Sequence, residues 1–194
     1  MGTGSSTVTA GDLDRVRREA EIIHKPIAIE RALDQMAAAI SEQMATSDPI
    51  LLAVMTGGMI PAVWLSGRLD FLHQLDYVHA TRYAGGTRGG QLNWLARPRL
   101  PLHGRTVLIV DDILDEGITM MEIAAYCREQ GADRIVTAAL VRKRHDRRAT
   151  GAEADIIGLE VPDRYVFGCG MDYHEHFREL KGVFALATAA EDQT

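Results

Sequence analysis

The chain of 194 residues has the size and composition of one globular domain, with 46% hydrophobic and 25% charged residues. No apolar stretch reaches the roughly 18 residues that a membrane span requires, and no signal-peptide pattern opens the chain. We therefore expect a cytoplasmic protein without a membrane partner. The net charge of −6 also disfavours nucleic acid as a partner. Neither Cys127 nor Cys169 has a neighbour at metal or redox spacing, so both are expected to be free thiols.

The N-terminal part of the chain predicts a leader followed by two helices. Residues 1–10 are rich in glycine, serine and threonine and are expected to form a disordered leader, with a single domain over 11–194. Asp12 can cap a short helix that runs to about Ile23, and Pro26 separates this helix from a second one. The second helix has an apolar face with three- and four-residue spacing, formed by Ile29, Leu33, Met36, Ala37, Ile40 and Met44.

From residue 50 onwards, strand-like apolar runs alternate with helix-like patterns. The predicted strands cover 50–55, 75–81, 107–110, 134–141, 155–161 and 183–186, and the predicted helices cover 60–72 and 118–130. Such alternation predicts an α/β fold with a mainly parallel sheet. We expect 107–110 to be a central strand and 183–186 to close the sheet.

Residues 107–120 join a buried strand to a group of acids. The apolar run 107–110 is expected to end at Asp111, and ligands of open α/β sheets bind beyond the carboxyl ends of strands. Asp111 and Asp112 can hold ribose hydroxyls or a hydrated divalent cation there, or can simply be solvated. The turn 115–119 precedes a helix, whose free N–H groups and dipole favour an anion such as a phosphate. The sequence contains neither a Walker loop nor a Gly-x-Gly-x-x-Gly motif, which disfavours ATP hydrolysis and dinucleotide binding.

Three further segments have both a functional and a structural interpretation. Gly57 and Gly58 follow a predicted strand, where they either allow close approach of an anion or simply form a tight turn. The glycine-rich segment 82–91 is expected to be a lid over a site or the tip of a hairpin. The basic run 142–148 is typical of a solvated face.

The stretch 107–120 resembles the phosphoribosyl pyrophosphate motif of type I phosphoribosyltransferases, in which an apolar strand, two acids and two apolar residues precede a phosphate-binding turn that ends in threonine. With Asp115 and the segments 162–168 and 171–180, the chain is similar to the hypoxanthine-guanine phosphoribosyltransferases of purine salvage. The resemblance covers roughly 50–186. It implies a type I phosphoribosyltransferase fold, with a mainly parallel central sheet, flanking helices and a small hood formed by the N- and C-terminal segments.

The resemblance implies Mg²⁺-dependent transfer of 5-phosphoribose from phosphoribosyl pyrophosphate to N9 of a 6-oxopurine base, hypoxanthine or guanine, with release of pyrophosphate. Asp115 is implied as the catalytic residue, acting as general base or acid at N7 of the purine. Lys143 is implied to read the exocyclic O6, Tyr165 to stack on the base, and the backbone of Val166 to bond its edge. The implied phosphoribose site comprises Asp111, Asp112, Asp115, Glu116, Gly117, Ile118 and Thr119. The implied pyrophosphate site comprises Thr56, Gly57 and Arg178. The implied base site comprises Lys143, Tyr165, Val166 and Asp172. The implied Mg²⁺ ligands are Asp111, Asp112 and Asp172, and the implied closing loop includes Arg82 and Tyr83.

Three positions depart from the family pattern. Thr56 and Ile118 stand where lysine is common, and Glu116 stands where threonine is common. We expect these departures to weaken phosphate binding without changing the class of reaction. Two alternatives are an enzyme that prefers xanthine and an RNA-binding regulatory member of the same fold. The basic run 142–148 favours the RNA-binding alternative, and Asp115 argues against it.

Family members usually form dimers or tetramers, which implies a homodimer or a homotetramer.

Overall fold

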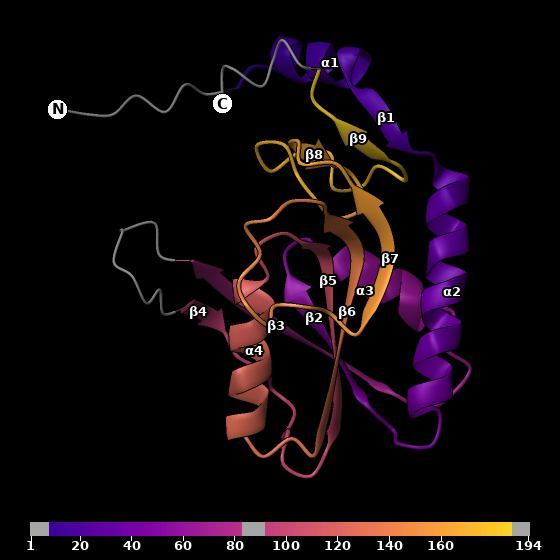
Figure 1. Ribbon diagram of the computed structural model, residues 1–194, viewed down its shortest axis with the longest axis vertical. Helices are drawn as coiled ribbons and strands as arrows, with labels where there is room; N and C mark the ends of the chain where they lie inside the picture. Colours follow the sequence, from indigo (N-terminus) through magenta and orange to yellow (C-terminus); the bar gives the residue numbers. More distant parts are fainter. Residues whose placement is uncertain (1–7, 83–91, 188–194) are drawn as a thin grey trace, which may run out of the picture.

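The computed structural model describes residues 8–82 and 92–187, with the side chain of Arg82 left undescribed (Figure 1). Within these ranges the chain forms a six-stranded sheet with the order β4-β3-β2-β5-β6-β7. Its strands are β2 (Ile50–Met55), β3 (Gln74–Arg82), β4 (Leu92–Ala96), β5 (Thr106–Leu114), β6 (Arg134–Lys143) and β7 (Ile156–Val161). Neighbouring strands pair in parallel from β3 to β7, and β4 pairs with β3 in the antiparallel direction. The predicted α/β fold with a mainly parallel sheet is confirmed.

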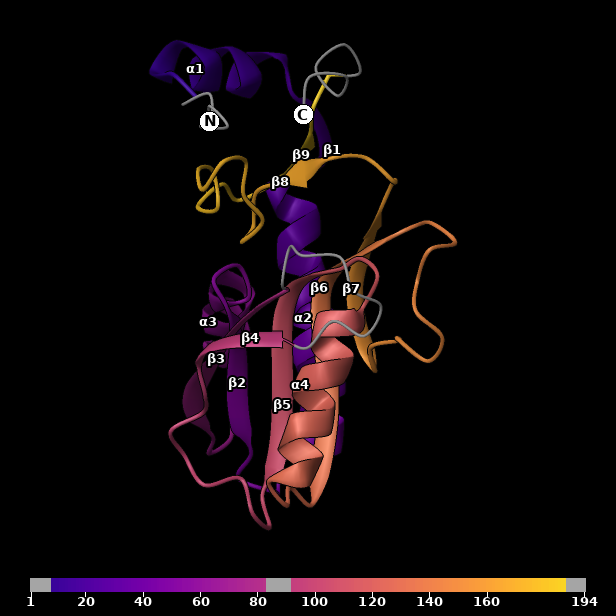
Figure 2. The ribbon, with the colours of Figure 1, turned by 90° about the vertical axis from the view of Figure 1, so that its left-hand side faces the viewer.

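Helices cover both faces of this sheet (Figures 1 and 2). The helices α2 (Pro26–Met44) and α3 (Met59–Ser66) pack on one face, and α4 (Ile118–Glu129) packs on the other. Along β5, Leu108 and Val110 join the core with α2 and α3, whereas Val107 and Ile109 join the core with α4. All four side chains are fully buried, and burial of each is worth roughly 1.5–3 kcal/mol. The prediction of a central strand buried on both faces is confirmed.

The amphipathic face of α2 is also confirmed. All six apolar residues predicted from the spacing are buried, and they pack against the sheet on the side of α3. Pro26 is the first residue of this helix, where its missing N–H removes no intrahelical hydrogen bond. None of the helices in the described ranges is long and apolar enough to cross a membrane.

A second, smaller sheet forms a hood over the carboxyl ends of the parallel strands (Figure 1). Its strands are β1 (Glu21–His24), β9 (Val183–Ala185) and β8 (Val166–Phe167), in that order and all antiparallel. The helix α1 (Ala10–Glu19) packs on the hood through Val16, which contacts a small core that includes Phe167 and Phe177. The predicted hood of N- and C-terminal segments is confirmed. The prediction that 183–186 closes the main sheet is wrong, because this strand finds its hydrogen-bond partners in β1 and β8.

The first helix differs from its prediction at both ends. Thr9, rather than Asp12, is the N-cap, and Asp12 is the third helical residue of a capping box in which each side chain bonds the backbone N–H of the other. The helix ends at Glu19, since the chain turns extended and residues 21–24 pair with β9. The predicted leader lies mostly outside the described residues, and its last residue, Ala10, begins α1.

Three further elements differ from the prediction. The strand β5 does not end at Asp111 but continues to Leu114, because it stays hydrogen-bonded to β6 along this length. The helix α3 ends at Ser66, six residues before the predicted end at Leu72, and Gly67 caps it. The strand β4 was not predicted from the sequence; it is a short edge strand that pairs with β3.

Both cysteines are buried free thiols, as predicted. Cys127 packs in the core beneath α4, and burial raises the pKa of its thiol to about 11. Burial likewise raises the pKa of the Cys169 thiol to about 12. Both are therefore protonated and unreactive at neutral pH.

Candidate active site

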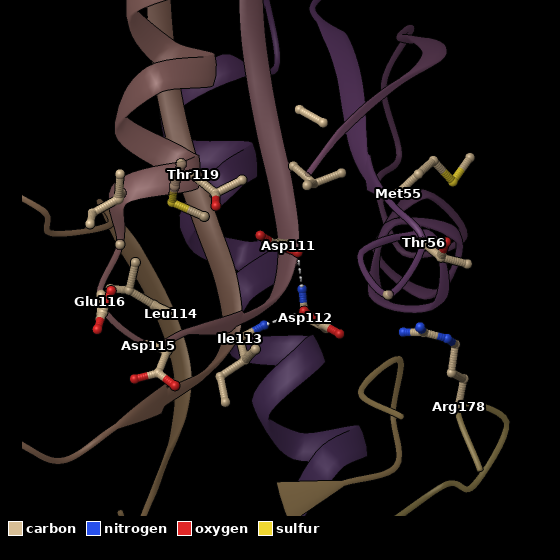
Figure 3. Close-up of a pocket in the computed structure, with 16 residues that line it drawn as sticks. Met55, Thr56, Asp111, Asp112, Ile113, Leu114, Asp115, Glu116, Thr119 and Arg178 are labelled. Atoms are coloured by element: carbon tan, nitrogen blue, oxygen red, sulfur yellow. Dashed lines mark hydrogen bonds between the residues drawn. The ribbon is translucent and has the colours of Figure 1, made fainter. Parts of the chain in front are cut away.

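Two hollows meet at the carboxyl end of β5, beneath the hood. The first has a volume of about 300 Å³ and is lined by the turn between β5 and α4, the turn between β2 and α3, and Arg178 (Figure 3). The second, of about 190 Å³, is lined by Lys143, Tyr165, Val166 and Asp172, among others. They share three residues of the central segment, Asp112, Ile113 and Asp115.

The structure thus sorts the predicted site residues into two groups. Every residue predicted for phosphoribose or pyrophosphate lines the first hollow, and every residue predicted only for the base lines the second. The predicted closing loop falls outside the described residues at Tyr83, and Arg82 is described only as the end of β3.

The turn between β5 and α4 is shaped by Gly117. This residue is the N-cap of α4 and has a left-handed backbone with φ 78°. A Cβ atom at this position would lie 2.6 Å from the Cβ of Ala152, so only glycine fits. The turn presents the uncapped first N–H groups of α4 to the hollow, and the hydroxyl of Thr119 lines it as well (Figure 3). Together these groups suit a phosphate.

The turn between β2 and α3 packs tightly against the carboxylate of Asp112. A Cβ atom on Gly57 would lie 1.8 Å from Asp112 Oδ2 and 2.9 Å from the carbonyl oxygen of Gly170. Arg178 donates to that same carbonyl at 2.8 Å and forms an ion pair with Asp172 at 2.8 Å. The guanidinium therefore lies beside the backbone of this turn, on the side to which Asp112 points (Figure 3).

Asp111 and Asp112 point to opposite sides of β5, Asp111 towards Thr119 and Asp112 towards Arg178 (Figure 3). The backbone N–H of Asp112 donates to Asp111 Oδ1 at 2.9 Å, and that of Ile113 donates to Asp112 Oδ1 at 2.7 Å. Burial raises the pKa of both carboxyls, and the charge of Asp112 raises the pKa of Asp111 further. A cation bound here would offset this cost.

The donor set of this region suits Mg²⁺, which prefers carboxylate oxygens and keeps several ligands from water and substrate. In the described part of the chain, no three His, Cys, Asp or Glu side chains lie close enough together to hold a metal ion. The predicted ligands Asp111, Asp112 and Asp172 therefore do not form a closed protein cage. Asp172 is paired with Arg178 in this structure.

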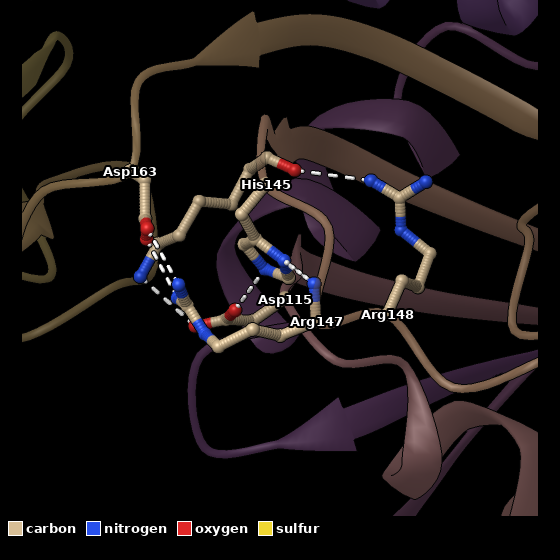
Figure 4. A network of polar contacts seen from close by, with 6 residues as sticks. Asp115, His145, Arg147, Arg148 and Asp163 are labelled. Atoms are coloured by element: carbon tan, nitrogen blue, oxygen red, sulfur yellow. Dashed lines mark hydrogen bonds and ion pairs between the residues drawn. The ribbon is translucent and has the colours of Figure 1, made fainter.

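Asp115 lies at the boundary of the two hollows and is held from two sides (Figure 4). Lys143 Nζ lies 2.9 Å from Asp115 Oδ2, and His145 Nε2 lies 2.6 Å from Asp115 Oδ1. Burial by itself would raise the pKa of Asp115, but the hydrogen bond and charge of Lys143, together with the hydrogen bond from His145, outweigh it and lower the pKa. Asp115 is therefore ionised at neutral pH.

The contact of His145 was not found from the sequence. His145 belongs to the basic run 142–148, for which the sequence predicts a solvated face. In the structure, the side chain of His145 is only 2% exposed. Its only signal was its position, two residues after the predicted base-reading Lys143.

The basic run is not an open cationic surface. Arg147 forms two hydrogen bonds with the carboxylate of Asp163, at 2.6 and 2.7 Å. The other arginines of the run also have acidic partners: Arg142 pairs with Glu153 and Glu160, Arg144 with Glu160, and Arg148 with Glu153. Their charge is locally balanced, which disfavours binding of a polyanion such as RNA.

Tyr165 offers an aromatic face at the entrance of the second hollow. Its side chain is 40% exposed, and its ring packs edge-on against Tyr173 with a centroid distance of 5.8 Å. The next residue, Val166, is buried and begins β8, so the hood fixes the position of both. A flat base can stack there while its edge faces the backbone of Val166.

Glu116 brings a negative charge to the turn. It lines the first hollow, and its carboxylate lies on the far side of the turn from Arg178 (Figure 3). The pKa of Arg147 is raised, first by its hydrogen bonds to Asp163 and further by the charges of Asp115 and Glu116. Glu116 thus also interacts with Arg147, which offsets part of its repulsion of a phosphate.

A family model described as the phosphoribosyl transferase domain matches residues 19–175. The chain therefore belongs to the phosphoribosyltransferase family. Among individual proteins, it is similar to the hypoxanthine-guanine-xanthine phosphoribosyltransferase of Tritrichomonas foetus, with 27% identity over 176 residues, covering 91% of this chain and 93% of the relative. The hypoxanthine-guanine phosphoribosyltransferase of Bacillus subtilis is 27% identical over 162 residues, covering 83% and 89%. A solved hypoxanthine phosphoribosyltransferase structure from Staphylococcus aureus has the same fold, with a TM-score of 0.84, 23% identity, and coverage of 92% and 96%.

Gly57→Ala tests the close packing of the predicted pyrophosphate turn. The added methyl group would collide with the Asp112 carboxylate and displace one of the two. We expect phosphoribosyl pyrophosphate to bind at least about tenfold more weakly, equivalent to about 1.4 kcal/mol, by isothermal titration calorimetry. Gly67→Ala is the matched control, because its Cβ would meet nothing closer than 3.7 Å. Equal affinities of the two variants would contradict the expected geometry.

Proposed function

We propose that this protein is a purine-salvage enzyme that transfers 5-phosphoribose from phosphoribosyl pyrophosphate to N9 of hypoxanthine or guanine, giving IMP or GMP and pyrophosphate. The observation that carries the proposal is the pair of adjoining hollows that share Asp112 and Asp115. One has the groups for a phosphorylated sugar, and the other has those for a 6-oxopurine. Family membership and the activities in the names of the similar proteins support the assignment.

In the first hollow, the 5′-phosphate would bind the turn between β5 and α4 through N–H groups and Thr119. Asp111 and Asp112 would accept hydrogen bonds from the ribose hydroxyls, and Arg178 and the backbone of Gly57 would bind the pyrophosphate group. Bond cleavage at the anomeric carbon leaves positive charge on the ribose and negative charge on the departing pyrophosphate. Donors aimed at the leaving group therefore carry more of the catalysis than a protein nucleophile would.

Asp111 and Asp112 would hold Mg²⁺ through substrate and water oxygens, and Asp172 would bind a second Mg²⁺. Each ion, when bound, supplies positive charge against the developing charge of pyrophosphate. Asp172 would have to exchange its ion pair with Arg178 for this contact, which would free Arg178 for pyrophosphate.

In the second hollow, the base would stack on Tyr165 with its edge at the backbone of Val166. Lys143, which pairs with Asp115 in this structure, would turn to donate to O6 of the purine. A cation at this position favours a 6-oxo group and disfavours a 6-amino group, which has no free acceptor to offer it.

In the chemical step, Asp115 takes the proton that the base loses. The lone pair of purine N9 forms the bond to the anomeric carbon while the bond from that carbon to the pyrophosphate oxygen breaks. The proton on N7 passes to the ionised carboxylate of Asp115, which stands at the boundary of the two hollows.

Two other assignments were open from the sequence. Preference for xanthine remains the second candidate, since the relative from Tritrichomonas foetus is named for three bases that include xanthine. An RNA-binding regulator is disfavoured, because the arginines of the basic run 142–148 are paired with acids.

We also propose that the chain forms a homodimer or a homotetramer. Leu75 and Tyr77 point to the same side of β3, because residues two apart in a strand share a face, and both are exposed. Val63 on α3 and Leu72 after it are exposed as well. A second copy of the chain would remove such apolar surface from water, and sedimentation equilibrium would give the number of subunits.

The activity assay tests the proposed function directly. The protein is mixed with phosphoribosyl pyrophosphate, Mg²⁺ and each of hypoxanthine, guanine, xanthine and adenine, and nucleotide formation is followed by chromatography. We expect turnover with hypoxanthine and guanine and none with adenine. Faster turnover with xanthine would favour the second candidate, and no turnover with any 6-oxopurine would refute the proposal.

Asp115→Asn tests the acid/base role at nearly constant shape. The amide cannot take the N7 proton, so we expect kcat to fall by about a hundredfold or more, whereas the KM for phosphoribosyl pyrophosphate changes little. Asp133→Asn, at the opposite end of the sheet, is the control. An unchanged kcat for the Asp115 variant would remove this residue from the chemical step.

Glu116→Gln tests the departure from the family pattern in the phosphate turn. Removal of one negative charge near a phosphate is worth about 1 kcal/mol at close range, so we expect a severalfold lower KM for phosphoribosyl pyrophosphate. Glu129→Gln, at the other end of α4, is the matched control. A KM that rises instead would mean that Glu116 supports the turn rather than opposing the phosphate.

A further inference from the structure

We propose that His145 is a positioning residue that holds one oxygen of Asp115 and leaves the other for the purine. The inference rests on the proposed function. It concerns a histidine outside every site residue predicted from the sequence. Two hydrogen bonds of its ring, one to each nitrogen, carry the argument.

The contacts of His145 allow one arrangement of its proton. The backbone N–H of Arg147 lies 3.0 Å from His145 Nδ1, and a backbone N–H can only donate. Nδ1 must therefore accept, which places the ring proton on Nε2. That proton is donated to Asp115 Oδ1, 2.6 Å away. Because the side chain is only 2% exposed, water has little access to compete for this bond.

Arg147 is itself held in place. Its guanidinium forms two hydrogen bonds with Asp163, which lies two residues before Tyr165 (Figure 4). The orientation of the imidazole is therefore tied to the segment that carries the base-stacking ring. A chain of contacts runs from Asp163 through Arg147 and His145 to Asp115.

This arrangement matters when the base binds. In the structure, Asp115 has one partner for each oxygen, Lys143 at Oδ2 and His145 at Oδ1. If Lys143 turns to the purine O6, as proposed above, Oδ2 loses its partner and becomes available to N7. His145 is then the remaining donor that keeps the carboxylate from rotating. A carboxylate that is held at one oxygen is pre-organised to receive the proton at the other.

Two substitutions separate positioning from bulk packing. His145→Leu removes the donor, and His145→Gln restores an N–H donor near the position of Nε2. We expect kcat to fall about tenfold to a hundredfold in the leucine variant, with the KM for phosphoribosyl pyrophosphate within about twofold of the unmodified protein. The glutamine variant is expected to recover most of kcat. His103→Gln, at an exposed histidine in the loop before β5, is the matched control and should not change kcat.

An unchanged kcat in His145→Leu, or equal losses in the leucine and glutamine variants, would overturn the positioning role. Thermal unfolding of each variant is measured as well, so that kcat values are compared only between variants that are folded at the assay temperature.

A second measurement needs no activity. In ¹⁵N-labelled protein, two-bond ¹H–¹⁵N correlations identify which ring nitrogen of each histidine carries the proton, and the His145→Gln variant assigns the signal. We expect the ring proton of His145 on Nε2 and none on Nδ1. A ring protonated at Nδ1 would overturn the inference. No turnover with any 6-oxopurine would refute the proposed function, while the protonation result would still decide the arrangement of Asp115, His145 and Arg147.

Discussion

The structure depends on how the chain compensates three carboxylates at the end of β5, two on the strand (Asp111 and Asp112) and one directly after it (Asp115). Burial of an unpaired charge costs several kcal/mol, so Asp111 and Asp112 need compensation from neighbouring groups, and the half-exposed Asp115 is held by two side chains. Asp111 and Asp112 receive backbone N–H groups, Asp112 also lies near Arg178, and Asp115 receives Lys143 and His145. The elements that meet at this edge of the sheet are largely those that supply these partners.

The close approach of backbone to side chain is the second constraint at this edge. Gly57 and Gly170 are packed so tightly against Asp112 that neither could carry a Cβ atom, and Gly117 has no room beside Ala152. Three turns from different parts of the chain thus converge within contact distance of the same strand end. Such packing leaves N–H groups facing a hollow, which is a suitable arrangement for binding phosphate groups without several lysines. The departures at Thr56 and Ile118 fit this arrangement.

The hood completes the site from the other side. Tyr165, Val166, Asp172 and Arg178 all come from the C-terminal segment that includes or adjoins the small sheet, and β9 pairs with the N-terminal β1. The N-terminal segment therefore supports residues that face the base, although none of its described residues, from 8 onwards, lines the two hollows. The pairing of β1 with β9 thus helps to hold the base-facing residues in place.

Much of this protein followed from local pattern. The apolar run 107–110 predicted a strand buried on both faces, the spacing along α2 predicted its buried residues, and the acid-rich turn before α4 resembled a phosphoribosyltransferase motif. These signals are local because periodicity, glycine and charge act over a few residues. Only the tertiary structure extended β5 to Leu114 and placed 183–186 in the hood, because strand ends and partners are decided by distant hydrogen bonds. It also joined Asp115 to Lys143 and His145, which lie 28 and 30 residues further along the chain and meet it only when β6 pairs beside β5.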